Sequence, residues 1–201
     1  LRKGKSFGCD CPAKVKINTF REAARDILIA TAFLLERSNE LKFDPGKIIL
    51  VGSSAGAEAV LNTAFMQYHH DFKELPYKNI KYAGLVSFAG ALLDVNYITD
   101  DNKIPILLFH GEKDNLVPFT TAPHHYCAPG TPGYLILEGA KTIADRMREL
   151  NESYQLMYDP DGNHDWANIP YARVETVSEF IRATVLEGQN IQSRISTKSK
   201  D

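Results

Sequence analysis

Hydrophobic and polar positions follow two different periods along this chain of 201 residues. Short runs of aliphatic and β-branched residues predict buried strands at residues 47–51, 83–88, 104–109 and 154–158. Apolar residues spaced three and four apart predict helices at about residues 19–39, 57–69, 140–150 and 172–186. Because strands that alternate with helices build a parallel sheet flanked by helices, the pattern predicts the α/β fold class.

The pattern also sets the expected boundaries. A capping box from Thr19 to Glu22 is expected to open the first helix, after a loop at residues 1–17. Residues 114–138 contain Pro, Gly and His and are expected to be mostly irregular. We expect a single domain over residues 1–186, followed by a polar, frayed tail at residues 187–201.

Composition narrows the range of partners. Hydrophobic residues make up 44% of the chain, and the formal net charge is -2. This balance provides no basic field for nucleic acid or anionic lipid. The longest apolar runs, such as residues 27–35, are far shorter than the roughly 20 residues that cross a bilayer. We therefore expect a small-molecule partner, with no nucleic acid and no membrane.

The three cysteines are Cys9, Cys11 and Cys127. An odd number leaves at least one of them outside any internal disulfide. A link from Cys9 or Cys11 to Cys127 stays open, but ordinary surface thiols are favoured. Only one residue separates Cys9 from Cys11 and no second pair follows, so a zinc site is disfavoured.

A candidate nucleophile follows the first predicted strand directly. Gly52-Ser53-Ser54-Ala55-Gly56 lies between a strand and a helix, which is the setting of a G-x-S-x-G nucleophile elbow. Side chains at 52 and 56 are expected to collide with neighbouring backbone, while the tight turn lifts the Ser54 hydroxyl above the sheet edge. The Ala55 N–H can then donate to an oxyanion, and Ser53 is expected to pack in the turn. The alternative is a Gly/Ser turn without a chemical role.

A serine nucleophile needs a base, and the base needs an orienting acid. Asp114 follows the strand at residues 104–109, and His164 follows the strand at residues 154–158. Because the carboxyl ends of parallel strands meet at one edge of a sheet, both side chains are expected near Ser54. The sequence therefore predicts a Ser54–His164–Asp114 triad.

Other polar residues near these positions have competing interpretations. Glu112 is a rival to Asp114 but lies closer to the strand end, and His110 is interpreted as holding the loop that carries Asp114. His124 and His125 show no carboxylate at a metal-ligand spacing, so a metal site there is disfavoured. We expect neither a metal nor an organic cofactor.

The remaining candidates receive structural interpretations. His69 and His70 are placed at a helix end, where they complement the helix dipole. Trp166 is expected to pack its loop rather than to wall an acyl site. Solvated turn positions are assigned to three acidic residues: Asp159, Asp161 and Asp165.

Together, three motifs resemble those of the α/β-hydrolase esterase/lipase family, over about residues 18–186. Residues 52–56 resemble its elbow, residues 110–118 its H-G-x-x-D-x-x-V-P acid loop, and residues 162–166 its G-x-H-x-W histidine loop. The resemblance implies hydrolysis of carboxylic esters through an acyl-enzyme. By analogy, it also suggests acetyl or aryl esters of carbohydrates as substrates.

The sequence departs from this family at its N-terminal side. There, earlier strands and an H-G-G-type loop, which supplies the second oxyanion donor, precede the helix that starts here near Thr19. The chain starts at Leu1 without a signal region, so we expect it to begin inside a longer product. A secreted or periplasmic location therefore stays open.

The same departure predicts an α/β-hydrolase type that lacks the N-terminal strands. We expect four parallel strands with one open strand edge, covered by an upstream segment or by a second copy. Loss of one oxyanion donor costs about 3–4 kcal/mol, which predicts a weak enzyme.

The resulting hypothesis is a serine hydrolase that cleaves small-molecule carboxylic esters. Two alternatives remain open. A serine peptidase of the same fold would use the same triad, which does not by itself distinguish an ester from an amide. A catalytically silent, hydrolase-like binding protein is the second alternative.

Overall fold

The main sheet is parallel and has five strands. The computed structural model describes residues 7–168 and 170–198. The strands pair in the order β1-β2-β4-β7-β8, and every neighbouring pair is parallel. Their bounds are β1 Ile49–Ser53, β2 Gly84–Phe88, β4 Ile106–Gly111, β7 Tyr154–Asp159 and β8 Gln192–Ser196. The predicted α/β class is confirmed, and the first four strands are the predicted ones with slightly shifted ends. The expected number of four strands is wrong, because β8 adds a fifth.

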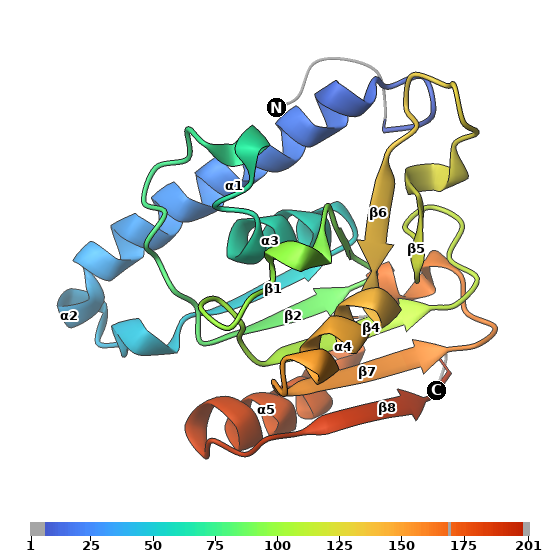
Figure 1. Ribbon diagram of the computed structural model, residues 1–201. Helices are drawn as coiled ribbons and strands as arrows, with labels where there is room; N and C mark the ends of the chain where they lie inside the picture. The colour runs from blue at the N-terminus through green and yellow to red at the C-terminus, as the bar shows by residue number, and fades with distance from the viewer. Residues whose placement is uncertain (1–6, 169, 199–201) are drawn as a thin grey trace.

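Helices cover both faces of this sheet. Successive strand residues point to opposite faces, so each strand contributes side chains to two cores. Leu85 and Leu108 belong to the larger core, which α1, α3 and α4 cover, whereas Val86 and Leu107 belong to a smaller core against α5. Figure 1 shows α1 and α3 on one side of the sheet and α5 on the other. The helix bounds are α1 Ala13–Glu36, α3 Ala55–Phe65, α4 Ala140–Glu149 and α5 Val174–Ile181, which continues as the π-helix η7 Arg182–Leu186.

Short helical turns connect these elements: α2 Ser38–Leu41, η1 Pro45–Lys47, η2 His70–Phe72, η3 Val95–Tyr97, η4 His124–Tyr126, η5 His164–Asn168 and η6 Pro170–Arg173. In the described part of the chain, no helix combines the length and the apolar character that crossing a membrane requires.

The start of the first helix differs from the prediction. Helix α1 begins at Ala13, directly after Pro12, so the loop expected at residues 1–17 ends earlier and the capping box at Thr19 is wrong. The Thr19 hydroxyl instead donates to the Val15 carbonyl oxygen at 2.9 Å, inside the helix. Pro12 fixes its own φ and favours a helix start, and the buried face extends back to Lys16.

Two further boundaries also differ. Helix α3 ends at Phe65 rather than at residue 69. The segment expected to be a frayed tail contains β8, which pairs with β7 from Tyr154–Gln192 to Tyr158–Ser196. The side chains of β8 are mostly exposed, so no alternation of apolar and polar residues marked it as a strand.

A second, small sheet includes two short strands from the region predicted to be mostly irregular, residues 114–138. It pairs β3 (Ala91–Leu92), β6 (Ile136–Gly139) and β5 (Thr121–Pro123) in antiparallel fashion. These strands are too short for a periodic pattern. Figure 1 shows β5 and β6 beside the carboxyl ends of β2 and β4.

A disulfide joins Cys9 to Cys127 across 118 residues of sequence. Cys11 is buried, so the interpretation of the cysteines as surface thiols is wrong. Of the two links left open by the sequence, the structure contains the one from Cys9. This bond ties the segment before α1 to the turn after β5.

The expected open strand edge lies at β1, which is the first strand in the sheet order. Val51 in this strand is 55% exposed, although it continues a hydrophobic run. The expectation that an upstream segment or a second copy covers this edge stays a prediction.

Candidate active site

Ser54 occupies a strained turn between β1 and α3. Its φ of 51° and ψ of -123° lie where residues other than glycine are rarely found, and such strain is typical of functional turns. A Cβ at Gly52 would lie 2.3 Å from the Gly56 carbonyl oxygen, so only glycine fits there. At Gly56, a Cβ would meet no atom within 4 Å among the described residues, and the collision expected there is wrong.

The first N–H of helix α3 is available to a ligand. The first N–H groups of any helix have no partner inside the helix. Ala55 opens α3 and is exposed, and its N–H makes no hydrogen bond to any residue that the structure describes. The Ser54 N–H, in contrast, donates to the Phe88 carbonyl oxygen at 2.8 Å. The Ala55 N–H is therefore a free donor at the elbow.

The three predicted triad residues meet at the carboxyl ends of the strands. The Ser54 Oγ lies 2.8 Å from the His164 Nε2, and the His164 Nδ1 lies 2.6 Å from the Asp114 Oδ2. Because a carboxylate only accepts hydrogen bonds, the Nδ1 of His164 carries the proton in this pair. The Nε2 lone pair then faces the Ser54 hydroxyl, which is the geometry of a base.

Asp114 is almost completely buried and fully hydrogen-bonded. Its Oδ1 accepts from the Leu116 and Val117 N–H groups, each at 2.9 Å. Burial alone would raise the pKa of Asp114, but hydrogen bonds from His110 and His164 outweigh burial and hold the pKa well below its usual value. The carboxylate therefore stays ionised through the neutral range.

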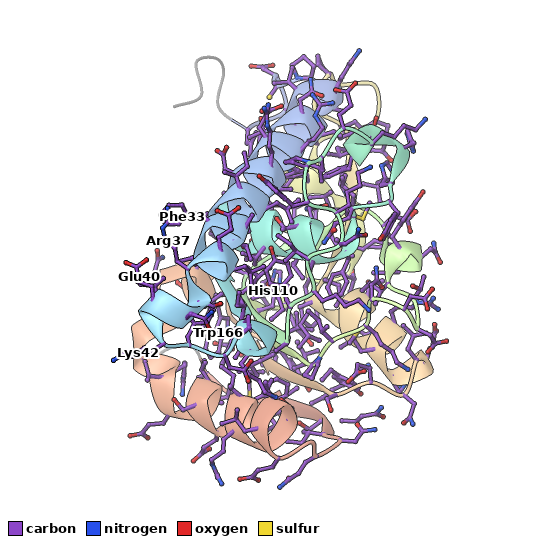
Figure 2. All side chains as sticks on the ribbon, turned by 90° about the vertical axis from the view of Figure 1, so that its left-hand side faces the viewer. Phe33, Arg37, Glu40, Lys42, His110 and Trp166 are labelled. Carbon is purple, nitrogen blue, oxygen red and sulfur yellow. A yellow bond between two sulfur atoms is a disulfide. The ribbon has the colours of Figure 1, made fainter. Side chains whose placement is uncertain are left out.

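His110 contacts and holds the loop that carries Asp114, as the sequence suggested. Its Nε2 lies 3.1 Å from the Val117 carbonyl oxygen and 3.3 Å from the Asp114 Oδ2. Figure 2 shows His110 and Trp166 in the interior of the molecule. Glu112, the rival acid, is exposed, and its carboxylate forms no ion pair or hydrogen bond with the described residues. Asp114 occupies the position beside His164.

The acid loop and the histidine loop are joined by contacts that the sequence did not reveal. The Asn163 Oδ1 accepts from the Asn115 N–H at 3.0 Å and from the His164 N–H at 2.9 Å. A Cβ at Gly111 would lie 2.2 Å from the Asn163 carbonyl oxygen, so glycine permits this close approach. The one available signal was the amide directly before His164. Asn163 thus fixes His164 relative to the acid loop.

The neighbours of the histidine loop also differ in part from expectation. Asp159 is buried rather than solvated, and its Oδ1 accepts from the Asp161 N–H at 3.0 Å. Trp166 is fully buried with its ring 5.3 Å from the Phe109 ring, which agrees with the packing interpretation. The Ser53 hydroxyl donates to the Ala167 carbonyl oxygen and so ties the elbow to the histidine loop.

His124 has a carboxylate partner that its sequence spacing did not indicate. The His124 Nε2 lies 3.2 Å from the Glu58 Oε1, and both side chains are 1% exposed. Buried Lys16 donates to the Gly133 carbonyl oxygen at 2.9 Å, and burial lowers the pKa of Lys16 while Cys11 and then Glu58 oppose this shift. Because Glu58 lies in the first turn of α3, this cluster lies close behind the elbow.

His69 and His70 lie beyond the end of α3 at Phe65, so the expectation that they end this helix is wrong. The His69 Nδ1 accepts from the Asp71 N–H at 3.1 Å and caps η2. Donor atoms of His69, His70 and Asp71 lie within 4.8 Å of one another, a spacing open to a metal ion. The hydrogen bond already uses one of the two His69 nitrogens.

Comparison with known proteins supports the fold. Among solved structures, the chain is similar to MGS-M1, described as an alpha/beta hydrolase enzyme from a Medee basin deep-sea metagenome library, with a TM-score of 0.54 and 17% identity. The match covers 82% of this chain and 64% of MGS-M1, so the chain spans less than two thirds of that protein. No family model matches the sequence, and a search of curated proteins gave no match. The chain has the α/β-hydrolase fold.

Proposed function

We propose that this protein is a serine hydrolase that cleaves carboxylic esters through an acyl-enzyme. The observation that carries the proposal is the hydrogen-bonded chain from Ser54 through His164 to Asp114, with distances of 2.8 and 2.6 Å. These residues come from three separate loops. A turn without a chemical role would not require such an arrangement beside a strained serine.

The first half of the reaction forms the acyl-enzyme. The Ser54 Oγ attacks the ester carbonyl carbon while its proton moves to the His164 Nε2. Asp114 keeps the proton on Nδ1 and stabilises the imidazolium, which it can do because its lowered pKa keeps it ionised. His164 then gives its proton to the leaving alkoxide, and the alcohol departs.

The second half returns the enzyme to its starting state. A water molecule loses a proton to His164 and attacks the acyl-enzyme carbonyl, after which Ser54 takes the proton back as the acid departs. During both attacks, the Ala55 N–H donates to the oxyanion. One such donor is worth about 3–4 kcal/mol in the transition state. The scheme requires no metal and no organic cofactor.

The proposed substrates are small-molecule esters, with acetyl or aryl esters of carbohydrates as the first class to test. The sequence resemblance to esterases and lipases supports esters over amides. The described likeness to MGS-M1 is compatible with hydrolase chemistry but supports only the fold.

A fluorophosphonate probe tests the nucleophile. We expect the probe to modify Ser54 in the folded protein, with Ser54→Ala abolishing the modification. Ser53→Ala is the control for the neighbouring hydroxyl: it also removes the bond to the Ala167 carbonyl oxygen, so labelling of Ser54 should slow but persist. Folded protein that remains unlabelled would contradict the proposal and favour a silent binding protein.

A pair of substrates with the same acyl group separates esterase from peptidase. 4-Nitrophenyl acetate and 4-nitroacetanilide differ only in the ester or amide bond. We expect turnover of the ester well above that of the amide, relative to the spontaneous rates. A larger enzymatic acceleration for the amide would favour the peptidase alternative.

A further inference from the structure

A strained turn at residues 124–127 lies next to the proposed triad and has no role in the scheme above. His125 has a φ of 56° and Tyr126 a φ of 51°, so two consecutive residues other than glycine adopt left-handed conformations. Each such residue carries a steric cost, and the cost is tolerated where the surroundings fix the conformation. The turn is therefore a place to look for function.

Both ends of this turn are firmly anchored. Cys127 is joined to Cys9 by the disulfide. His124 is buried, with its Nε2 3.2 Å from the Glu58 Oε1 and its N–H donating to the Leu135 carbonyl oxygen at 2.8 Å. These contacts fix the turn on both sides of His125 and Tyr126.

Hydrogen bonds connect the middle of the turn to the catalytic acid. The His125 N–H donates to the Leu116 carbonyl oxygen at 2.8 Å, and the Leu116 N–H donates to the Asp114 Oδ1 at 2.9 Å. His125 is partly exposed, and Tyr126 is 49% exposed. The backbone of the turn therefore lies against the loop that carries Asp114.

Burial and the charged groups of the triad shift the pKa values of His125 and Tyr126. Burial, followed by the neighbouring His124, Lys16 and His164, lowers the pKa of His125 to about 4. Burial and then the Asp114 carboxylate raise the pKa of Tyr126. At neutral pH the turn therefore presents an uncharged imidazole and an uncharged phenol, each able to donate and to accept a hydrogen bond.

The position of the turn indicates which part of an ester it meets. In the proposed reaction, His164 delivers a proton to the leaving alkoxide, so the alcohol group must lie beside His164. The oxyanion lies at the other side, against the Ala55 N–H. The turn is hydrogen-bonded to the acid loop, and the charges of His164 and Asp114 act on His125 while that of Asp114 acts on Tyr126, so we place the turn on the alcohol side and not on the oxyanion side.

We propose that His125 and Tyr126 form the subsite for the alcohol part of the ester, and that this alcohol is an uncharged ring that carries hydroxyl groups, such as a sugar. His125 exchanges hydrogen bonds with a hydroxyl, while the half-exposed Tyr126 ring offers its face to the ring carbons. This subsite rests on the proposed esterase function.

Two acetyl esters that differ in their alcohol test the subsite. One is 4-nitrophenyl acetate, and the other is a methyl glycoside with one acetyl group and free hydroxyls. We expect His125→Ala to lower kcat/KM for both, with a drop about tenfold larger for the glycoside, because one hydrogen bond to its hydroxyl is lost. His125→Gln retains a donor and an acceptor and should recover part of the difference.

A matched control is His70→Ala, since His70 is an exposed histidine of η2 with a side chain 68% exposed. It should change neither kcat/KM value. Equal losses for the two esters in His125→Ala would mean that the residue supports the fold or the acyl side, and would overturn the subsite.

Failure of the proposed function can be told apart from failure of the subsite. If Ser54 resists the fluorophosphonate and neither ester is hydrolysed, the esterase proposal fails. Binding of the same acetylated methyl glycoside, measured by NMR titration, then judges the subsite. Binding that weakens about tenfold on His125→Ala supports it, and unchanged or undetectable binding overturns it.

Discussion

The acid and histidine side of the site and the nucleophile side are held in contrasting ways. Asp114 is buried, accepts two backbone hydrogen bonds and lies over His110, while Asn163 joins its loop to that of His164. Ser54, in contrast, follows the edge strand β1, and the neighbouring Ala55 is exposed.

In the proposed mechanism, this contrast separates the groups that the fold holds in place from those that must meet a substrate. The group that must stay charged lies in the interior, where its hydrogen bonds outweigh the cost of burial. The hydroxyl that must reach a substrate, together with the N–H that must meet an oxyanion, lies at the open side.

Removal of the nucleophile or the base should have the largest effect. We expect Ser54→Ala and His164→Ala each to lower kcat for ester hydrolysis by at least about 10⁴-fold, because the two side chains act as one unit. For the same reason, the double variant should be no slower than either single one. Steady-state kinetics with 4-nitrophenyl acetate measure this, and additive losses would mean that the two residues act independently.

Neutralising the buried acid should have the next largest effect. Asp114→Asn keeps the shape but removes the charge that holds the His164 tautomer, so kcat should fall by about 10³- to 10⁴-fold. Glu112→Gln is the matched control on the same loop and should change kcat little. If Glu112→Gln were the slower variant, the acid would be misassigned.

Removal of the disulfide, which anchors the turn at residues 124–127, should destabilise the protein. Cys127→Ser should lower the free energy of unfolding by about 2–4 kcal/mol, since the bond spans a long stretch of chain. Cys9→Ser should give the same loss, and the double variant should be no less stable. Urea denaturation under non-reducing conditions measures these values, and unequal single losses would point to another partner for one thiol.

Acid should remove the stability that Asp114 contributes. Its folded pKa lies below the value near 3.9 of an unfolded Asp, so the contribution is fully present above about pH 4. It should be lost as the pH falls from there through the folded pKa. Urea denaturation between pH 2 and 6 should show a smaller loss for Asp114→Asn than for the wild type. Parallel curves would mean that Asp114 is not stabilised in the folded protein.

The smallest effect is expected from removal of the Asn163 side chain, which forms a hydrogen-bonded bridge between the acid loop and the histidine loop. Asn163→Ala removes the acceptor for the Asn115 and His164 N–H groups, so His164 should be held less firmly. We expect a loss of about tenfold in kcat, as for one hydrogen bond, with little change in KM. Asn115→Ala keeps the backbone donor and serves as the control. Equal losses in the two variants would argue against the bridge.

The interior of the sheet could be predicted from the sequence, whereas its edges could not. Strands β2 and β4 are buried on both faces and appear as continuous apolar runs. Strand β8 is exposed and carries no such run. The start of α1 was misplaced because Thr19 fits a cap, while Pro12 and the buried Lys16 mark the true first turns.

The candidate site, too, could be predicted from the sequence only in part. Ser54, Asp114 and His164 each follow a predicted strand, so the rule that strand ends meet at one edge of a parallel sheet predicts that they lie together. The Glu58–His124 pair and the choice of Cys9 over Cys11 depend on contacts between distant segments. Sequence spacing contains no information on such contacts.

Trapping of the acyl-enzyme tests the central claim most directly. The protein is mixed with 4-nitrophenyl acetate, quenched in acid and digested, and the peptides are analysed by mass spectrometry. The account predicts one acetyl group on Ser54, absent in Ser54→Ala and present in Ser53→Ala. Release of nitrophenol with the acetyl group on another residue, or with Ser54 never acetylated, would contradict it.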